Sequence, residues 1–267
     1  MSITKAVLRF AAPLPKIERF ERFLFLGPHP DDIEIGAGAT AAKLAAEGKH
    51  VTFLICTDGR YGLDYAPEGT TPEALIAIRQ RESMASAKKL GVTDVRFLPY
   101  EDGGFYDEDE LLRAVAAVIG DTQPQVLFAP DQCVRSECHA QMIRVRSECH
   151  ADHLRVGECA RRLAFAAPSR PVMERLGAGP APVEAIAYYM TAKPNRIVGT
   201  RGTFARQLEA LLCHESQFPA GCAALRSVQL YLKLRAIDFG VRSGKGLAEG
   251  FRVLGQTQMH CLPEADK

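Results

Sequence analysis

The chain has 267 residues, of which 47% are hydrophobic and 24% are charged, and its formal net charge is +1. Its length and composition are typical of a globular protein that can bury a large core without disulfides. The near balance of charge, without a basic stripe, argues against nucleic acid as a partner. The N-terminus lacks the apolar segment of a signal peptide, and no apolar run approaches the roughly 20 residues of a membrane span. We therefore expect a cytoplasmic protein.

Short apolar runs alternate with helical patterns from residue 23 onward. Strands are predicted at 23–27, 51–56, 95–98, 126–129 and 183–189, and helices at 38–48, 71–90 and 111–119. This alternation predicts an α/β fold with a Rossmann-like, mostly parallel sheet flanked by helices. Right-handed crossovers place the carboxyl ends of the strands at one edge, where ligands bind. We expect one domain over 1–267, with a core at about 21–200 and a C-terminal portion at about 201–260.

The first predicted strand ends in the turn Pro28-His29-Pro30-Asp31-Asp32. The two prolines stiffen this turn and so fix where the imidazole and the carboxylates point. Adjacent carboxylates raise each other's pKa unless a cation balances them. A divalent metal would remove this conflict, because one aspartate could bind it while the other handles a proton.

A second polar group, His150-Ala151-Asp152-His153, follows the fourth predicted strand. If it opens a helix, His150 and His153 share a face. Two imidazoles and one carboxylate form a catalytic zinc site that leaves one position for water, which can then attack a carbonyl. Either motif alone is more often a solvated loop or surface polarity, but their common location at one sheet edge favours a joint site.

These residues resemble the LmbE-like, or PIG-L, family of zinc-dependent N-acetylglucosaminyl deacetylases. The likeness covers about residues 23–251 and follows the family's order of landmarks. The landmarks lie at 28–38, 57–59, 79–82 with 90–92, 150–153 and 213–217. The His-Pro-Asp-Asp block is specific, whereas the helical landmarks are weak when taken alone.

The resemblance implies that the two polar motifs, at 28–32 and 150–153, together supply a metal site and a general base. His29, Asp32 and His153 would bind the metal, and Asp31 would take a proton from the attacking water. Zinc is the expected ion, although a site of two histidines and one aspartate also accepts iron or cobalt.

The resemblance also implies roles for four further side chains. His150, held by Asp152, would stabilise the developing charge or protonate the leaving amine. Arg79 matches a position that faces the substrate, and His214 matches one at the rim of the pocket. The alternatives for these two are an ordinary solvated arginine and a satisfied helix histidine.

The function predicted from these residues is removal of acetate from a small N-acetylglucosamine-containing glycoside or glycolipid precursor. One alternative is an amidase that acts on a thiol conjugate of an amino sugar. Another is a non-catalytic, Rossmann-like binding module, although no Gly-x-Gly-x-x-Gly follows the first strand. A homo-oligomer is compatible with the sequence.

Residues 134–144 and 145–155 form a tandem duplication with eight identical positions of eleven. Only the second copy carries Asp152 and His153, so we expect the metal ligand there. The duplication and its surroundings hold Cys133, Cys138, His139 and Cys149. The favoured interpretation of this segment is a lengthened surface loop, and the alternatives are a soft-metal site and a redox-sensitive lid.

Overall fold

A seven-stranded sheet with the order β3-β2-β1-β4-β5-β7-β6 forms the centre of the protein. The computed structural model describes residue 7, residues 10–131 and residues 150–260. The parallel strands are β1 (Arg22–Gly27), β2 (His50–Thr57), β3 (Asp94–Tyr100), β4 (Val126–Pro130) and β5 (Ala185–Tyr189). The antiparallel strands are β6 (Arg196–Gly199) and β7 (Ala248–Gly255). The predicted α/β class and mostly parallel sheet are confirmed.

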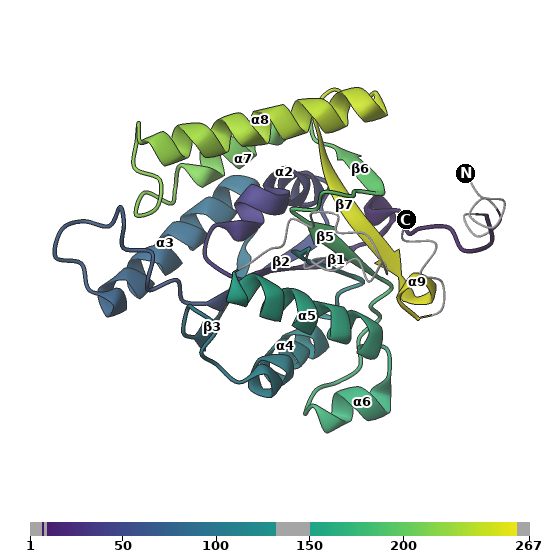
Figure 1. The fold of residues 1–267 in the computed structure, drawn as a ribbon. Helices are drawn as coiled ribbons and strands as arrows, with labels where there is room; N and C mark the ends of the chain where they lie inside the picture. Colours follow the sequence, from purple (N-terminus) through teal and green to yellow (C-terminus); the bar gives the residue numbers. More distant parts are fainter. Residues whose placement is uncertain (1–6, 8–9, 132–149, 261–267) are drawn as a thin grey trace, which may run out of the picture.

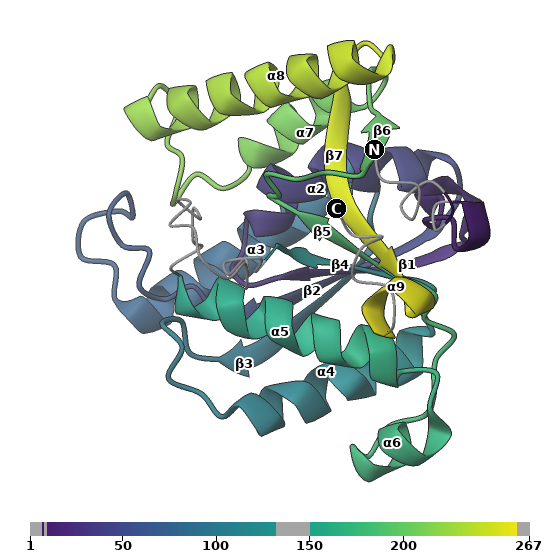
Figure 2. The same ribbon diagram turned by 45° about the vertical axis from the view of Figure 1, so that its right-hand side comes forward.

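Helices cover both faces of this sheet (Figures 1 and 2). The layer on one face consists of α2 (Asp32–Ala46), α3 (Pro72–Leu90), α7 (Phe204–Leu211) and α8 (Ala223–Ser243). The layer on the other face consists of α4 (Glu108–Thr122) and α5 (Ala151–Ala166), with α6 (Arg170–Arg175) at its end. The shorter elements are η1 (Ile17–Arg19) and α9 (Gln256–His260). Of the helices in the described ranges, none is both long and apolar enough to cross a membrane.

The central strand β1 shows why its sequence is continuously apolar. Phe23 and Phe25 point into the core beneath α2 and α3, whereas Leu24 and Leu26 point into the core beneath α4 and α5. Successive side chains of a strand alternate between faces, so a sheet covered on both sides needs apolar residues at every position. Phe25 stacks on Phe128 of β4, with ring centroids 4.1 Å apart.

Helix α2 begins at Asp32, earlier than the predicted start at 38. Glycines lower helix propensity, which hid this first turn in the sequence. The structure shows why Gly36 is there: a Cβ atom on it would lie 2.2 Å from the ring of Tyr189. Ala37 interrupts the helix with a φ of −153°. The close approach of α2 to β5 therefore explains both the glycine and the error in the prediction.

The elements after β5 extend the fold beyond those predicted from the sequence. Helix α8 was not predicted, because apolar residues occupy both of its faces and hide the amphipathic periodicity of a helix. Its buried side includes Leu225, Leu232 and Phe239. Its outer side exposes Leu230, Leu234, Ile237 and Val241. A helix that is apolar around its circumference has no clear amphipathic periodicity, so the sequence signal was weak.

Candidate metal centre

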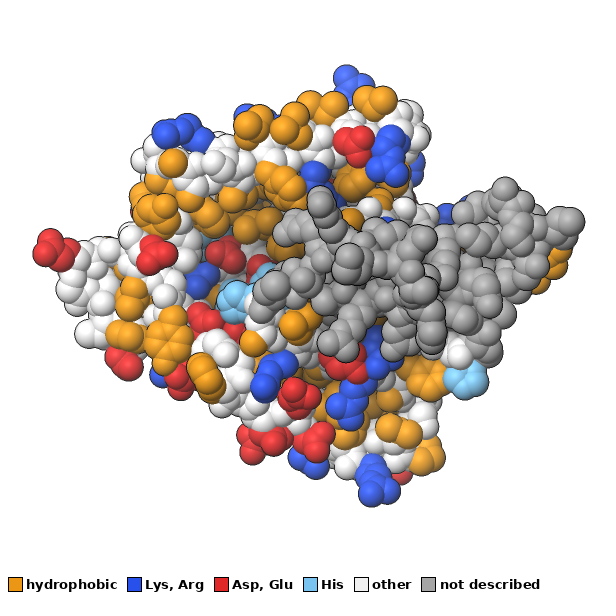
Figure 3. Space-filling view, viewed as in Figure 1, with side chains coloured by type: hydrophobic (Ala, Val, Ile, Leu, Met, Phe, Trp, Pro, Cys, Tyr) orange, Lys and Arg blue, Asp and Glu red, His pale blue; other side chains and the backbone are white. Residues whose placement is uncertain are grey.

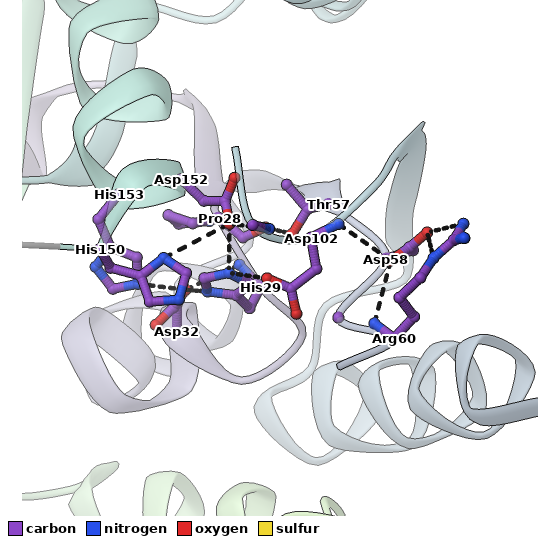
Figure 4. Close-up of polar contacts among 12 residues, drawn as sticks. Pro28, His29, Asp32, Thr57, Asp58, Arg60, Asp102, His150, Asp152 and His153 are labelled. Atoms are coloured by element: carbon purple, nitrogen blue, oxygen red, sulfur yellow. Dashed lines mark hydrogen bonds and ion pairs between the residues drawn. The ribbon is translucent and has the colours of Figure 1, made fainter. Parts of the chain in front are cut away.

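Three histidines and three aspartates meet beyond the carboxyl ends of the parallel strands (Figure 4). They come from the turn after β1, the loop after β3 and the start of α5. The residues are His29, Asp32, Asp102, His150, Asp152 and His153. In the space-filling view, histidine and acidic side chains reach the surface together in a hollow (Figure 3). This is the sheet edge at which the sequence predicted the site.

The predicted metal ligands His29, Asp32 and His153 lie together. Asp32 Oδ2 is 3.1 Å from His29 Nδ1 and 3.2 Å from His153 Nε2. The same oxygen accepts a hydrogen bond from the backbone N–H of His29 at 2.8 Å, which fixes the carboxylate within the turn. Potential ligand atoms of all three residues lie within 4.8 Å of one another. Two imidazoles and one carboxylate, gathered in this way, fit a divalent metal.

Asp102 adds an acidic group that the sequence interpretation missed. Its Oδ1 lies 3.2 Å from His29 Nε2, and Asp152 Oδ2 lies 3.1 Å from the same nitrogen. Burial lowers the pKa of His29, but hydrogen bonds with Asp102, Asp152 and Asp32 outweigh burial and raise this pKa well above its usual value. Three carboxylates around one buried imidazole are a concentration of negative charge that a bound cation would balance. The one sequence feature that could have pointed to Asp102 is the Asp102-Gly103 pair after the third predicted strand.

Asp31 has a strained backbone, and the buried guanidinium of Arg79 lies beside its carboxylate. Its φ is 132°, in a region that side chains other than glycine rarely adopt. Arg79, only 3% exposed, donates to Asp31 Oδ2 at 3.0 Å and to the Pro30 carbonyl at 2.6 Å. It also donates to the Gly59 carbonyl at 2.9 Å. Arg79 thus ties the turn after β1 to the loop after β2.

The environment of Asp31 suits a group that accepts a proton. Burial, together with the negative charge of the neighbouring Asp32, raises the pKa of Asp31 to about 6 against the opposing charge of Arg79. A carboxylate with a pKa near neutrality is more basic than a free one and therefore more effective as a general base. The geometry is thus compatible with the role that the resemblance implied.

His150 is the accessible histidine of the cluster. Its side chain is 47% exposed, whereas those of His29 and His153 are each 11% exposed. His150 Nδ1 lies 3.5 Å from Asp152 Oδ2, and that oxygen also accepts the backbone N–H of Gly103 at 2.9 Å. Burial opposes the ionised form of Asp152, but hydrogen bonds with His29 and with the backbone of Gly103 outweigh burial and lower the pKa of Asp152. A buried carboxylate therefore orients an exposed imidazole.

His214 lies behind the turn after β1. It is fully buried, and its Nε2 is 3.3 Å from Glu34 Oε1, which also accepts a hydrogen bond from Ser86 Oγ. Burial lowers the pKa of His214, but the charge of Glu34 outweighs burial and raises it. Substrate contact by Arg79 and His214 stays a prediction. The contacts seen here connect both side chains to protein groups around Asp31.

The remaining landmarks of the resemblance contact one another. Ser216, between α7 and α8, donates through its backbone N–H and its hydroxyl to Glu82 on α3. Gln217 donates to the Gly62 carbonyl at 2.7 Å. The segment at 213–217 therefore braces α3 and the loop after β2, the two elements that hold Arg79 and its Gly59 partner. Residues 132–149, which include Cys133, Cys138, His139 and Cys149, lie outside the described residues, so the role of the duplication stays a prediction.

The model of the PIG-L family, described as GlcNAc-PI de-N-acetylase, matches residues 24–164. The chain belongs to the PIG-L family. Within that family, it is 31% identical to diacetylchitobiose deacetylase of Thermococcus kodakarensis over 92% of this chain and 87% of the relative. It is also 38% identical to a 1D-myo-inositol 2-acetamido-2-deoxy-alpha-D-glucopyranoside deacetylase of Streptomyces avermitilis, over 46% of this chain and 51% of the relative.

A solved PIG-L-like structure has the same fold throughout. The N,N'-diacetylchitobiose deacetylase of Pyrococcus horikoshii matches with a TM-score of 0.83 and 28% identity, covering 100% of this chain and 98% of that one. The predicted enzyme class, an amide hydrolase that acts on N-acetyl groups, is confirmed. The thiol-conjugate amidase and the non-catalytic binding module are not favoured.

Proposed function

We propose that this PIG-L protein is a metal-dependent deacetylase that releases acetate from the N-acetylglucosamine unit of a small glycoside. The observation that carries the proposal is the cluster of His29, Asp32 and His153 with the strained Asp31 beside it, at the edge where parallel sheets bind ligands. The named activities of its relatives on acetylated amino sugars support this substrate class. An amide of this kind needs an activated water and a proton for nitrogen.

His29, Asp32 and His153 would hold the metal. A divalent ion there supplies a Lewis acid that polarises the amide carbonyl and makes water a stronger nucleophile. Asp31 takes a proton from the attacking water as the new carbon–oxygen bond forms. Arg79 holds the Asp31 carboxylate through Oδ2, so the base enters the reaction already oriented.

His150 completes the reaction on the other side of the cluster. Its exposed imidazole can reach a substrate, while Asp152 holds it in one orientation. As the carbon–nitrogen bond breaks, protonated His150 donates to the leaving nitrogen, and the products are acetate and the free amino sugar. Burial and the charges of His29 and His153 lower the pKa of His150, so its imidazolium is a stronger acid than a free one. Before the carbon–nitrogen bond breaks, the His150 imidazolium can stabilise the negative charge that develops on the carbonyl oxygen. The division of work between Asp31 and His150 thus supplies both the base and the acid.

Zinc is the metal that we propose for this site, because zinc is common with histidine and aspartate ligands in hydrolases. Iron(II) and cobalt(II) accept the same donors. A cytoplasmic location and a homo-oligomeric state also stay predictions. The exposed apolar row on the outer side of α8 supports self-association, since exposed apolar patches often mark protein contacts.

The test of the proposed function is metal content and acetate release in the same preparations. Elemental analysis of the wild type is expected to find about one divalent ion per chain, and His153→Ala should lose it. The matched control is His50→Ala, which changes an exposed histidine in the first residue of β2, at the opposite edge of the sheet. It should keep both the metal and the rate of acetate release from N-acetylglucosamine glycosides.

Two results would reject the proposal. Wild-type protein that neither contains a divalent metal nor takes one up on addition of zinc has no metal centre of the proposed kind. A metal-loaded wild type that releases no acetate from any acetylated amino sugar would retain the centre but refute the reaction. Circular dichroism of His153→Ala distinguishes loss of a ligand from loss of the fold.

A further inference from the structure

The loop between β3 and α4 presents an aromatic ring to solvent beside the metal centre. Phe105 is 85% exposed, although burying such a side chain would stabilise the fold by roughly 1.5–3 kcal/mol. Scattered exposed apolar residues are common and need no explanation by themselves. The position of Phe105 relative to the catalytic cluster is what makes this one informative.

The residues before Phe105 are part of the site itself. Asp102 contacts His29, and the backbone N–H of Gly103 donates to Asp152. The Phe105 ring folds over this backbone, because a Cβ atom on Gly103 would lie 3.1 Å from it. Two Cα steps of about 3.8 Å keep Phe105 within about 7.6 Å of Gly103. The ring therefore lies against the loop whose residues contact Asp152 and His29.

The loop also packs tightly against the start of α5. A Cβ atom on Gly104 would lie 2.7 Å from the Cβ atom of Ala151, the residue after His150. Gly104 has a φ of 79°, so its conformation also favours glycine. The backbone that carries Phe105 is thus held by contacts on both sides, so a ligand that binds to the ring would order little further backbone.

A second exposed aromatic residue and two charged groups continue this margin. Tyr61, in the loop after β2, is 51% exposed, and its hydroxyl donates to Glu101. Arg60 lies 3.7 Å from Glu101 and forms an ion pair with Asp58 at 2.6 Å. These contacts join the loops after β2 and β3 into one polar and aromatic rim.

Figure 4 shows how this rim adjoins the catalytic cluster. Asp102 lies between His29 and the pair formed by Asp58 and Arg60. Its backbone N–H is 3.4 Å from Asp58 Oδ1, so the two loops meet at this point. Hydrophobic side chains also lie along the visible side of the hollow in the space-filling view (Figure 3).

We propose that Phe105 and Tyr61 form a subsite for the ring that is joined to the reacting amino sugar. This inference rests on the proposed deacetylase function. A polyhydroxylated six-membered ring has an apolar face of C–H bonds, which an aromatic ring can cover, and a periphery of hydroxyls. Glu101 and Arg60 offer an acceptor and a donor for those hydroxyls. A second pyranose and an inositol share this chemistry, and the substrates below distinguish them.

The test compares substrates with one and two rings on the metal-loaded protein. Phe105→Ala is expected to lower kcat/KM for di-N-acetylchitobiose about five- to tenfold, the range expected from losing one aromatic contact. It should change kcat/KM for N-acetylglucosamine by less than about twofold, because the reacting ring keeps all its contacts. An N-acetylglucosaminyl-inositol substrate reports which second ring the subsite prefers.

The matched control is Phe165→Ala. Phe165 is 47% exposed and lies near the far end of α5, stacked on His260. About 14 residues of helix separate it from His150, or roughly 21 Å. This variant should leave both substrates unchanged. Phe105→Tyr keeps an aromatic face and should retain most of the two-ring activity.

Equal losses on both substrates, or no loss on either, would overturn the subsite. If the wild type hydrolyses neither substrate, the proposed function fails, and calorimetric titration with di-N-acetylchitobiose tests the subsite by itself. Binding by the wild type that weakens at least fivefold in Phe105→Ala would still support it. Equal affinities, or no binding to the wild type, would reject it.

Discussion

The part of the chain from β1 to α5 and the part after β5 serve the metal centre in different ways. The first part carries His29, Asp31 and Asp32 in a short turn at the end of a strand. The second part places side chains behind that turn, such as His214 against Glu34 and Gln217 against Gly62. The chemistry thus lies in local motifs, while their support comes from residues far away in the sequence.

This difference arises from the topology of the sheet. Parallel strands bring their carboxyl ends to one edge of the sheet. Short motifs that directly follow these strands therefore lie close together because of the topology alone. The antiparallel strand β7 instead delivers Glu249 beneath the kink in α2. Its carboxylate accepts the backbone N–H groups of Ala39 and Thr40, and Gln207 donates to it as well. Substitutions in the two parts should therefore have effects of different kinds.

The largest effect on catalysis is expected from Asp31→Asn. Asparagine has nearly the same shape but cannot accept a proton, so kcat should fall by about 10²- to 10⁴-fold. Metal content should stay at the wild-type level, because Asp31 is not among the expected ligands. Steady-state kinetics and elemental analysis on one preparation measure both quantities. An unchanged rate would remove Asp31 as the base and leave the first part without its proposed proton acceptor.

A smaller effect is expected from Arg79→Lys, which tests how the two loops are joined. Lysine cannot make the three separate contacts of the guanidinium group with Asp31, Pro30 and Gly59. If Arg79 positions the base, kcat should fall about tenfold to a hundredfold with little change in KM. Direct substrate binding, the role that the resemblance implies, would instead raise KM. The control is Arg81→Lys, an exposed position on the same helix that should have neither effect.

The sequence was most informative where structure depends on neighbouring residues. Helix α3 was predicted well because Thr71 caps its first turn and Gly91, with a φ of 84°, ends it. The turn at 28–32 was recognisable because its prolines and carboxylates lie together. These local signals located the polar motifs, and the resemblance then implied which three residues are the metal ligands that the structure brings together.

The sequence was least informative where a residue acts through a distant contact. Gly36 lay outside the predicted helix, and the reason for a glycine there is the ring of Tyr189 in another strand. Asp102 lies in a loop with no distinctive spacing, and its value comes from His29 across the sheet edge. The burial of Arg79 and His214 likewise depends on packing between elements that no short pattern records. The positions and contacts of these residues therefore depend on tertiary structure, which short sequence motifs do not record.

The smallest effect is expected from Glu249→Gln, and it concerns stability more than catalysis. Burial raises the pKa of Glu249 to about 7, although hydrogen bonds from Thr40 and Ala39 oppose the shift. Because this pKa lies above the value of 4.5 for a free glutamate, the folded protein binds more protons than the unfolded chain between these values. The contribution of Glu249 to stability is therefore complete below pH 4.5 and is lost as the pH rises through 7.

Thermal unfolding at pH 5 and pH 8 measures this contribution. The wild type should lose stability between the two values, whereas Glu249→Gln, which carries no ionisable group there, should lose less. We expect the difference in Tm between the two proteins to change by roughly 2–4 °C, the shift expected for about 1 kcal/mol in a chain of this size. Glu174→Gln, at a carboxylate that is 60% exposed, should follow the wild type. Parallel pH profiles for Glu249→Gln and the wild type would mean that this carboxylate is already ionised in the fold. In that case the ionised carboxylate of Glu249 on β7 would accept the backbone hydrogen bonds of α2. The part of the chain after β5 would then stabilise α2 through charge as well as through packing.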